Sequence, residues 1–256
     1  MTTLTQAAPA ARTARRPFTI WLALALPPML FLALIVAASI YFGASGITDP
    51  VRIAAEVQAA TPWLLLIAQV CLLAGVVVAL RASRLTWAEA GWAPAPGQSA
   101  WREAALGALL GLALGLLYVL ALSPLQAWLQ QTFGDYVPTG ETLSTVGASL
   151  IPFFIANVAL APFVEESLYR GYAFTLLRRR YSLPLAFALL ALFFGLLHWA
   201  GGFWYILLTG LAAGSLFTGL RAWRGGLLAP FTAHLAVNVV EFLFVWLSAP
   251  GWGVMP

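Results

Sequence analysis

The sequence predicts an all-α, polytopic helical membrane protein with about seven transmembrane helices and a polar site inside the membrane. Two observations lead to this fold class. Apolar residues make up 62% of the 256 positions and charged residues only 9%, whereas a soluble domain carries about 25% charged residues. The apolar residues also form runs of about 20 residues, the length that crosses a bilayer as a helix. This composition excludes a soluble protein, and the lack of a basic face with interleaved aromatic residues argues against a nucleic-acid partner.

Seven apolar stretches predict the spanning helices. They lie at about 18–42, 62–80, 103–122, 148–177, 183–200, 203–220 and 226–247. We expect residues 1–147 to form N-terminal membrane helices with interfacial segments, and residues 148–248 to form a helical core, within a single membrane domain. The first stretch is too long for the apolar part of a signal peptide, so we expect it to remain in the protein.

The segments between these stretches differ in character. The segment TDPVRIAAEVQAATP (48–62) has mixed polarity, with Asp49 and Pro50 as a helix start, and LQAWLQQTFGDYVP (125–138) combines aromatic residues with glutamines. We expect both to lie at the membrane interface, which also suits a lipid bilayer as partner. Residues 86–100 contain prolines and glycines and are expected to form a loop. Cys71, the single cysteine, has no partner for a disulfide and is expected to be buried.

The arginines predict the orientation of the chain, which contains no lysine. With the N-terminus in the cytoplasm, only Arg52 falls outside and only Arg170 falls within the membrane. The cytoplasmic positions then hold Arg12, Arg15, Arg16, Arg81, Arg84, Arg102, Arg178, Arg179, Arg180, Arg221 and Arg224. This asymmetry follows the positive-inside rule and predicts a C-terminus on the outside. The lack of lysine indicates a GC-rich genome, so we expect a bacterial cytoplasmic membrane.

Three charged residues lie within the fourth predicted span, in the stretch FVEESLYRGY. Glu166 and Arg170 are four residues apart with the acid first, so they share a helix face and can pair. Glu165 projects about 100° away and shares its face with Tyr169. The group can be a buried ion network that holds helices together, or a functional site, the default interpretation of charges inside a membrane. The second carboxylate favours the functional interpretation, because the arginine need not neutralise it.

The two histidines of the chain both lie in apolar helices. Phe194 precedes His198 by four residues and is expected to pack on the same face, while His234 and Asn238 share a face by the same spacing. A single histidine in a membrane helix is more often a packing residue than a ligand. Measured along their helices from the nearest arginine, Glu165, His234 and His198 lie roughly 20, 15 and 27 Å deep. All three therefore fall in the hydrocarbon interior and can converge.

Such a group of side chains can hydrolyse an acyl bond in two ways. A buried carboxylate can deprotonate water, with one histidine orienting that water and a second histidine and an amide donating to an oxyanion. Alternatively, Glu165, His198 and His234 can hold a divalent metal such as zinc, although the HExxH spacing is absent. The sequence leaves open whether the cofactor is a metal or none.

These three motifs resemble the CPBP intramembrane proteases, which include the type II CAAX prenyl endopeptidases and bacterial Abi-type proteins. The matching residues are Glu165, Glu166 and Arg170, then Phe194 and His198, then His234 and Asn238, within about residues 148–245. The resemblance implies that residues 148–248 form the catalytic core. It also implies that Glu165 activates water with His198, that His234 and Asn238 stabilise the oxyanion, and that Glu166 and Arg170, with Tyr169 and Phe194, support the site.

The expected function is therefore that of an intramembrane endopeptidase acting on a membrane-associated peptide or protein, with prenylation of the substrate left open. Glu241 lies outside the family pattern and near a helix end, and we expect it to be an outer-surface charge. Two alternatives remain. One is a non-enzymatic immunity or scaffold protein that binds a peptide or membrane partner. The other is a transporter with a proton relay, which the lack of an inverted repeat disfavours.

Overall fold

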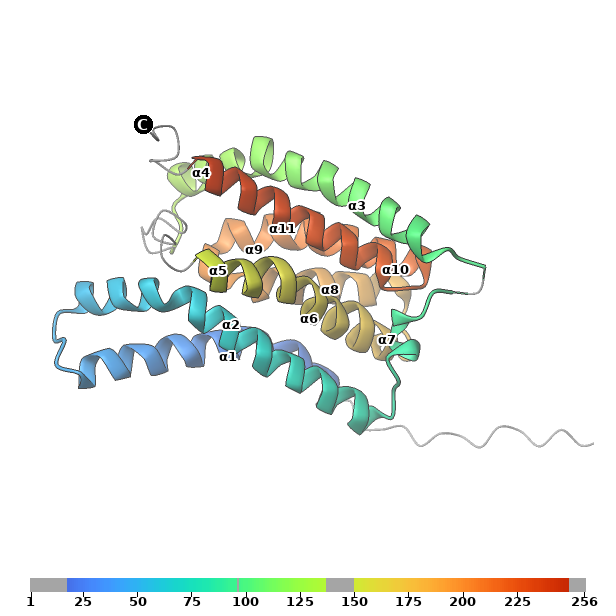
Figure 1. The fold of residues 1–256 in the computed structure, drawn as a ribbon, viewed down its shortest axis with the longest axis horizontal. Helices are drawn as coiled ribbons and strands as arrows, with labels where there is room; N and C mark the ends of the chain where they lie inside the picture. The colour runs from blue at the N-terminus through green and yellow to red at the C-terminus, as the bar shows by residue number, and fades with distance from the viewer. Residues whose placement is uncertain (1–17, 96, 137–149, 249–256) are drawn as a thin grey trace, which may run out of the picture.

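A computed structural model describes residues 18–95, 97–136 and 150–248, and every regular element in those ranges is helical (Figure 1). Within them, five helical stretches are long and apolar enough to span a membrane: Ile20–Ala44, Pro50–Ser83, Ala100–Phe133, Leu150–Leu177 and Phe203–Arg224. Two shorter apolar helices, Leu183–Leu197 and Leu228–Phe244, match the fifth and seventh predicted spans. The predicted class, a polytopic helical membrane protein, is confirmed.

Helices α1 (Phe18–Ala44) and α2 (Pro50–Ser83) form an antiparallel hairpin along one side of the molecule (Figure 1). Residues 50–62, expected to be a separate interfacial segment, instead form the first turns of α2. Asp49 caps this helix as predicted, because its side chain accepts a hydrogen bond from the backbone N–H of Val51 at 3.0 Å and Pro50 occupies the first turn. With 34 residues, α2 is roughly 50 Å long, about 20 Å more than the hydrocarbon core.

Helix α3 (Ala100–Leu117) continues through a π-helical turn, Tyr118–Leu122, into α4 (Ser123–Phe133). It packs along α11 (Leu228–Ser248) over much of its length. Three glycines four residues apart make this approach possible. A Cβ atom on Gly107 or Gly111 would lie 2.1 Å from a backbone oxygen of α11, and one on Gly115 would lie 2.8 Å from Val240. Close packing through small residues is a common way for membrane helices to associate.

Residues 150–177 form one nearly continuous rod that carries the charged motif. It consists of α5 (Leu150–Phe153), a π-helical segment (Phe154–Leu160), α6 (Ala161–Glu165), a second π-helical segment (Glu166–Ala173) and α7 (Phe174–Leu177). The rest of the core follows as α8 (Leu183–Leu197), α9 (Phe203–Thr209), a π-helical turn (Gly210–Gly214) and α10 (Ser215–Arg224), which leads into α11. The change of helix type between Glu165 and Glu166 lies at the charged motif, and π-bulges are frequent at functional sites.

The segment after α4 holds the turn between α8 and α9, where Gly202 adopts a positive φ of 94°. Asp135 accepts hydrogen bonds from the backbone N–H groups of Phe203 at 2.9 Å and Trp204 at 3.4 Å, so it caps the first turn of α9. The hydroxyl group of Tyr136 donates a hydrogen bond of 2.8 Å to the carbonyl oxygen of Trp199. The N-terminal helices thereby fix the backbone that directly follows His198.

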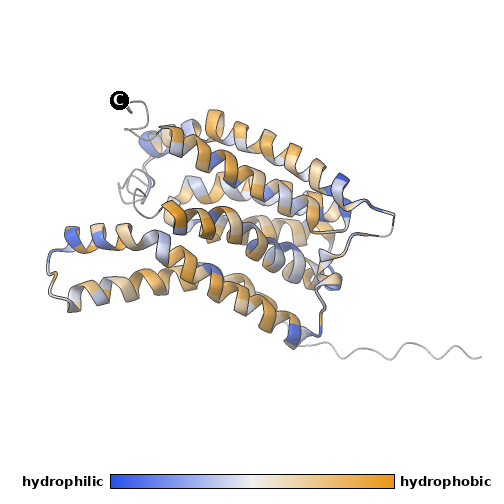
Figure 2. Ribbon diagram, in the orientation of Figure 1, coloured by the Kyte–Doolittle hydropathy of each residue, from blue (hydrophilic) through white to orange (hydrophobic). Residues whose placement is uncertain are grey.

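The helix ends that carry arginines lie at one end of the bundle. The ends of α2, α7 and α10 and the start of α3 meet there, opposite the end of α11 (Figure 1). Arg221 is not a free loop charge, because it is buried and donates to the carbonyl oxygens of Arg170 and Ala90. Cys71 is exposed, so the expectation of burial is wrong. Apolar residues cover the outward faces of the long helices, as lipid contact requires (Figure 2).

Candidate functional site

A buried ion pair between Glu166 and Arg170 lies at the centre of the site. The two side chains are fully buried and are joined by a 3.0 Å contact between Glu166 Oε1 and an Arg170 guanidinium nitrogen. Arg170 also donates to the Thr218 hydroxyl at 3.3 Å and to the Gly214 carbonyl oxygen at 2.9 Å. The predicted pairing of the second glutamate with the arginine is thus present, and the guanidinium also has one partner on α10 and one in the π-helical turn that precedes α10.

The ring of Phe194 connects this pair to the histidines. The Arg170 guanidinium lies 4.2 Å from the centre of the Phe194 ring, a cation–π geometry. Ring centres of His198 and His234 lie 5.1 and 5.7 Å from the same ring. Tyr169 packs edge-on against it at 5.6 Å. The expectation that Phe194 packs beside His198 is confirmed, and the Phe194 ring also contacts Arg170, Tyr169 and His234.

His234 lies between the two glutamates. Its Nδ1 is 2.9 Å from Glu166 Oε1, and its Nε2 is 3.9 Å from Glu165 Oε2. Because Glu166 Oε1 also accepts from Arg170, we assign the proton of the shorter contact to Nδ1 of His234. The contact between Glu166 and His234 was not expected from the sequence, since 68 residues separate the two. Glu166 therefore contacts His234 as well as Arg170.

The Glu165 carboxylate is held by a residue that the sequence interpretation did not single out. Gln69 on α2 donates its side-chain N–H to Glu165 Oε1 at 3.3 Å, and both side chains are buried. The other oxygen, Oε2, has no hydrogen-bond partner among the described residues. As the sequence predicted, Glu165 is left free of the arginine. A polar residue inside the apolar run LLLIAQVCLL was the signal that could have identified Gln69.

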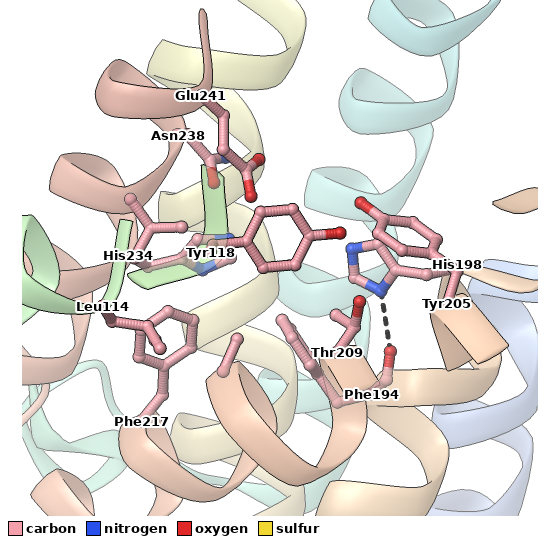
Figure 3. A pocket seen from close by; sticks show the side chains of 12 residues that line it. Leu114, Tyr118, Phe194, His198, Tyr205, Thr209, Phe217, His234, Asn238 and Glu241 are labelled. Atoms are coloured by element: carbon pink, nitrogen blue, oxygen red, sulfur yellow. Dashed lines mark hydrogen bonds between the residues drawn. The ribbon is translucent and has the colours of Figure 1, made fainter. Parts of the chain in front are cut away.

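A small cavity of about 30 Å³ opens beside the two histidines (Figure 3). Its polar lining consists of Tyr118, His198, Tyr205, Thr209, His234, Asn238 and Glu241. Since a water molecule needs about 10–15 Å³ of such space, the cavity has room for about two. His198 is oriented by a 2.8 Å hydrogen bond between its Nδ1 and the Phe194 carbonyl oxygen, so its Nε2 is directed away from that bond (Figure 3).

The structure brings most predicted site residues together and corrects one. His198, His234 and Asn238 share the cavity, and Glu165 approaches it through its contact with His234. Asn238 donates its side-chain N–H to the Asn157 carbonyl oxygen at 2.7 Å, which fixes the amide. Glu241 was expected to be an outer-surface charge, but it lines the same cavity, because its seven-residue spacing from His234 keeps it on the inner face of α11.

Glu165, His198 and His234 were also considered as ligands of a divalent metal. Within the ranges that the structure describes, no three histidine, cysteine, aspartate or glutamate side chains are grouped closely enough to share an ion. The bond between Nδ1 of His234 and Glu166 is compatible with ligation through Nε2, because metal-binding histidines commonly donate their other N–H to a carboxylate.

Residues 147–240 match the family model described as type II CAAX prenyl endopeptidase Rce1-like. No curated protein and no solved structure matches the chain. The matched range contains every residue of the three motifs. It begins well after Gln69 and ends one residue before Glu241, so neither of these two residues lies within it. The resemblance to the CPBP and CAAX proteases is thus confirmed over this range, which is less than half of the chain.

Proposed function

We propose that this chain, which belongs to the CPBP and CAAX protease family through residues 147–240, is a glutamate-dependent intramembrane endopeptidase. Its substrate would be a membrane-associated peptide or protein. One observation carries the proposal: a buried carboxylate with a free oxygen, Glu165 Oε2, lies 3.9 Å from a histidine whose other nitrogen is held by a second carboxylate. Glu166 Oε2 also has no hydrogen-bond partner among the described residues, but Glu166 is paired with Arg170 through Oε1 at 3.0 Å, whereas Glu165 has no arginine contact.

In the proposed reaction, Glu165 acts as general base. Its free Oε2 takes a proton from water, and the resulting hydroxide attacks the carbonyl carbon of the scissile peptide bond. His198, fixed through Nδ1, presents Nε2 to orient this water. When the tetrahedral intermediate collapses, the C–N bond breaks and the proton held by Glu165 passes to the leaving amine. Water is the only nucleophile, so no acyl-enzyme forms.

The oxyanion of the intermediate would be stabilised by His234 and Asn238. In this role His234 would donate from Nε2 to the oxyanion while its Nδ1 keeps the bond to Glu166 Oε1. Asn238 uses its amide to bind the Asn157 carbonyl oxygen and keeps a second N–H for the substrate. Donors fixed before the reaction in this way are worth about 10²–10³ in rate each.

The proposal is tested with purified protein in liposomes and a library of membrane-associated peptides, read by mass spectrometry in ¹⁸O-labelled water. We expect products whose new carboxyl group contains one labelled oxygen. Replacing Glu165 by Gln should lower turnover about 10²–10⁴-fold, the usual contribution of a general base. Exhaustive chelation should leave turnover intact. Peptides that bind but are never cut, with binding unaffected by His198→Ala and His234→Ala, would contradict the protease and favour an immunity or scaffold protein.

We also propose that the N-terminus and the arginine-rich end of the bundle face the cytoplasm and the C-terminus faces outward. The positive-inside rule supports this orientation, since the arginine-bearing helix ends meet at one end. Single cysteines introduced at positions 179 and 222 in a Cys71→Ser background should be protected from impermeant reagents in intact cells. A cysteine at the C-terminus should react, and its protection would contradict the orientation.

A further inference from the structure

Glu241 is the carboxylate of the cavity that the proposed reaction does not use. It lies on α11, seven residues after His234 and three after Asn238, and all three side chains line the cavity. Its carboxylate points into this space above the ring of Tyr118 (Figure 3). The position therefore places a second acidic group beside the residues proposed to act on the scissile bond.

No ion pair within the described ranges includes Glu241. The ion pairs there join Glu103, Glu165 and Glu166 to arginines or to His234. The polar lining of the cavity also contains the hydroxyl groups of Tyr118, Tyr205 and Thr209, together with His198, His234 and Asn238. The cavity lining contains no arginine. Acidic groups inside a membrane are costly and usually serve a partner.

We propose that Glu241 binds an ammonium group of the substrate and thereby selects peptides with a positive charge next to the cleaved bond. This inference rests on the proposed function, because it assigns a substrate class to the same cavity. The cavity of about 30 Å³ has room for about two water-sized groups, and a compact ammonium group is close to water in size. In a site of low dielectric, an unpaired carboxylate attracts such a group much more strongly than it would in water.

The ammonium group can come from a lysine side chain or from a free N-terminus. The test uses peptides that carry lysine or the neutral isostere norleucine at each position around the cleaved bond, each with a free or an acetylated N-terminus. We expect the wild-type protein in liposomes to cut a lysine or free-amine peptide at least ten times faster, in kcat/KM, than its neutral counterpart. Glu241→Gln should bring this ratio close to one, whereas Glu241→Asp and the exposed control Glu56→Gln should keep it.

The position that shows the preference identifies the source of the ammonium group. A wild-type protein that cuts neutral and lysine peptides equally well would overturn the inference and leave the protease proposal intact. So would a preference that survives Glu241→Gln. If Glu241→Gln does not fold, the wild-type ratio still decides between these outcomes.

If no peptide is cut, the protease proposal fails and the binding of the same peptides decides the inference alone. Affinity is then measured by competition against a photo-crosslinking lysine peptide in liposomes. Tighter binding of lysine than of norleucine peptides, lost in Glu241→Gln, would support the ammonium site. Equal binding would overturn it.

Discussion

The N-terminal helices and the C-terminal core are both apolar in sequence, but they differ in how much of their surface is buried inside the protein. Among the five long spans, Leu150–Leu177 is the least apolar and yet the most buried, with 56% of its 18-residue apolar window buried compared with 22% for Ile20–Ala44. In a soluble protein the more apolar segment would be inside. In a bilayer the lipid accepts the apolar faces, so the polar residues mark the interior.

The N-terminal helices do more than hold the protein in the membrane, because they also contact the site in the core. The N-terminal helices supply Gln69 to the Glu165 carboxylate, and the glycines of α3 let α11 approach closely. Asp135 caps the helix that follows His198. The division between the two regions can therefore be tested by substitutions on each side.

The largest effect is expected for Glu166→Gln in the core. This change leaves Arg170 buried without its carboxylate and weakens the contact with His234, and breaking a buried pair costs about 3–5 kcal/mol. Thermal unfolding in detergent should show a large drop in Tm. Glu165→Gln should change Tm little, and so should the exposed control Glu56→Gln. Similar melting of the two motif variants would contradict the separate roles of the two glutamates.

A substitution of Gln69 tests whether the N-terminal helices contribute to the proposed reaction. Gln69→Leu removes one hydrogen bond to a charged group, worth about 1.5–3 kcal/mol, and should lower kcat roughly 10–100-fold with little change in KM. Val70→Ala, on the neighbouring exposed position, serves as control. Since Gln69 positions Glu165, the pH profile of kcat should shift in Gln69→Leu. If Gln69→Leu has a normal kcat and an unchanged pH profile of kcat, the N-terminal helices do not contribute to the site.

A substitution of a glycine in α3 is expected to have a smaller effect, on stability and on turnover. A methyl group on Gly111 would lie 2.1 Å from the Ala233 carbonyl oxygen, so Gly111→Ala must push α3 away from α11, next to His234. Overpacking of this kind costs about 1–3 kcal/mol. We expect a lower Tm and reduced turnover, and Leu109→Ala on the exposed face of α3 should change neither. Unaltered turnover in a destabilised Gly111→Ala would show that α11 tolerates the displacement.

The smallest effect is a pH dependence at the junction of the two regions. Burial tends to raise the pKa of Asp135, but hydrogen bonds from the backbone N–H groups of Phe203, Tyr136 and Trp204 outweigh it and lower the pKa. The carboxylate therefore contributes stability that is complete above its unfolded pKa of about 3.9 and is lost as pH falls through the lower folded value. Asp135→Asn should lower stability by less than about 1 kcal/mol at pH 7. The difference between the two melting temperatures should therefore narrow as pH is lowered below the unfolded pKa, and a difference that stays constant would contradict the assignment.

Sequence periodicity predicted the part of the site that lies on single helices. Glu166 with Arg170, Phe194 with His198 and His234 with Asn238 are each four residues apart, and each pair faces one direction in the structure. Contacts between helices could not be predicted in this way. The bonds from Gln69 to Glu165 and from His234 to Glu166 join residues 96 and 68 positions apart. Only the packing of the helices sets such distances.

The sequence by itself determined the membrane class, the approximate spans and the polar residues of the three motifs, because bilayer thickness and the cost of buried charge act on composition and spacing alone. Tertiary structure decided which oxygen of Glu165 stays free, that Cys71 faces outward and that Glu241 faces inward. An apolar helix has no hydropathic preference between lipid and protein. Its rotation is therefore set by close packing and interhelical hydrogen bonds, such as the α3 glycines against α11, which appear only when the helices assemble.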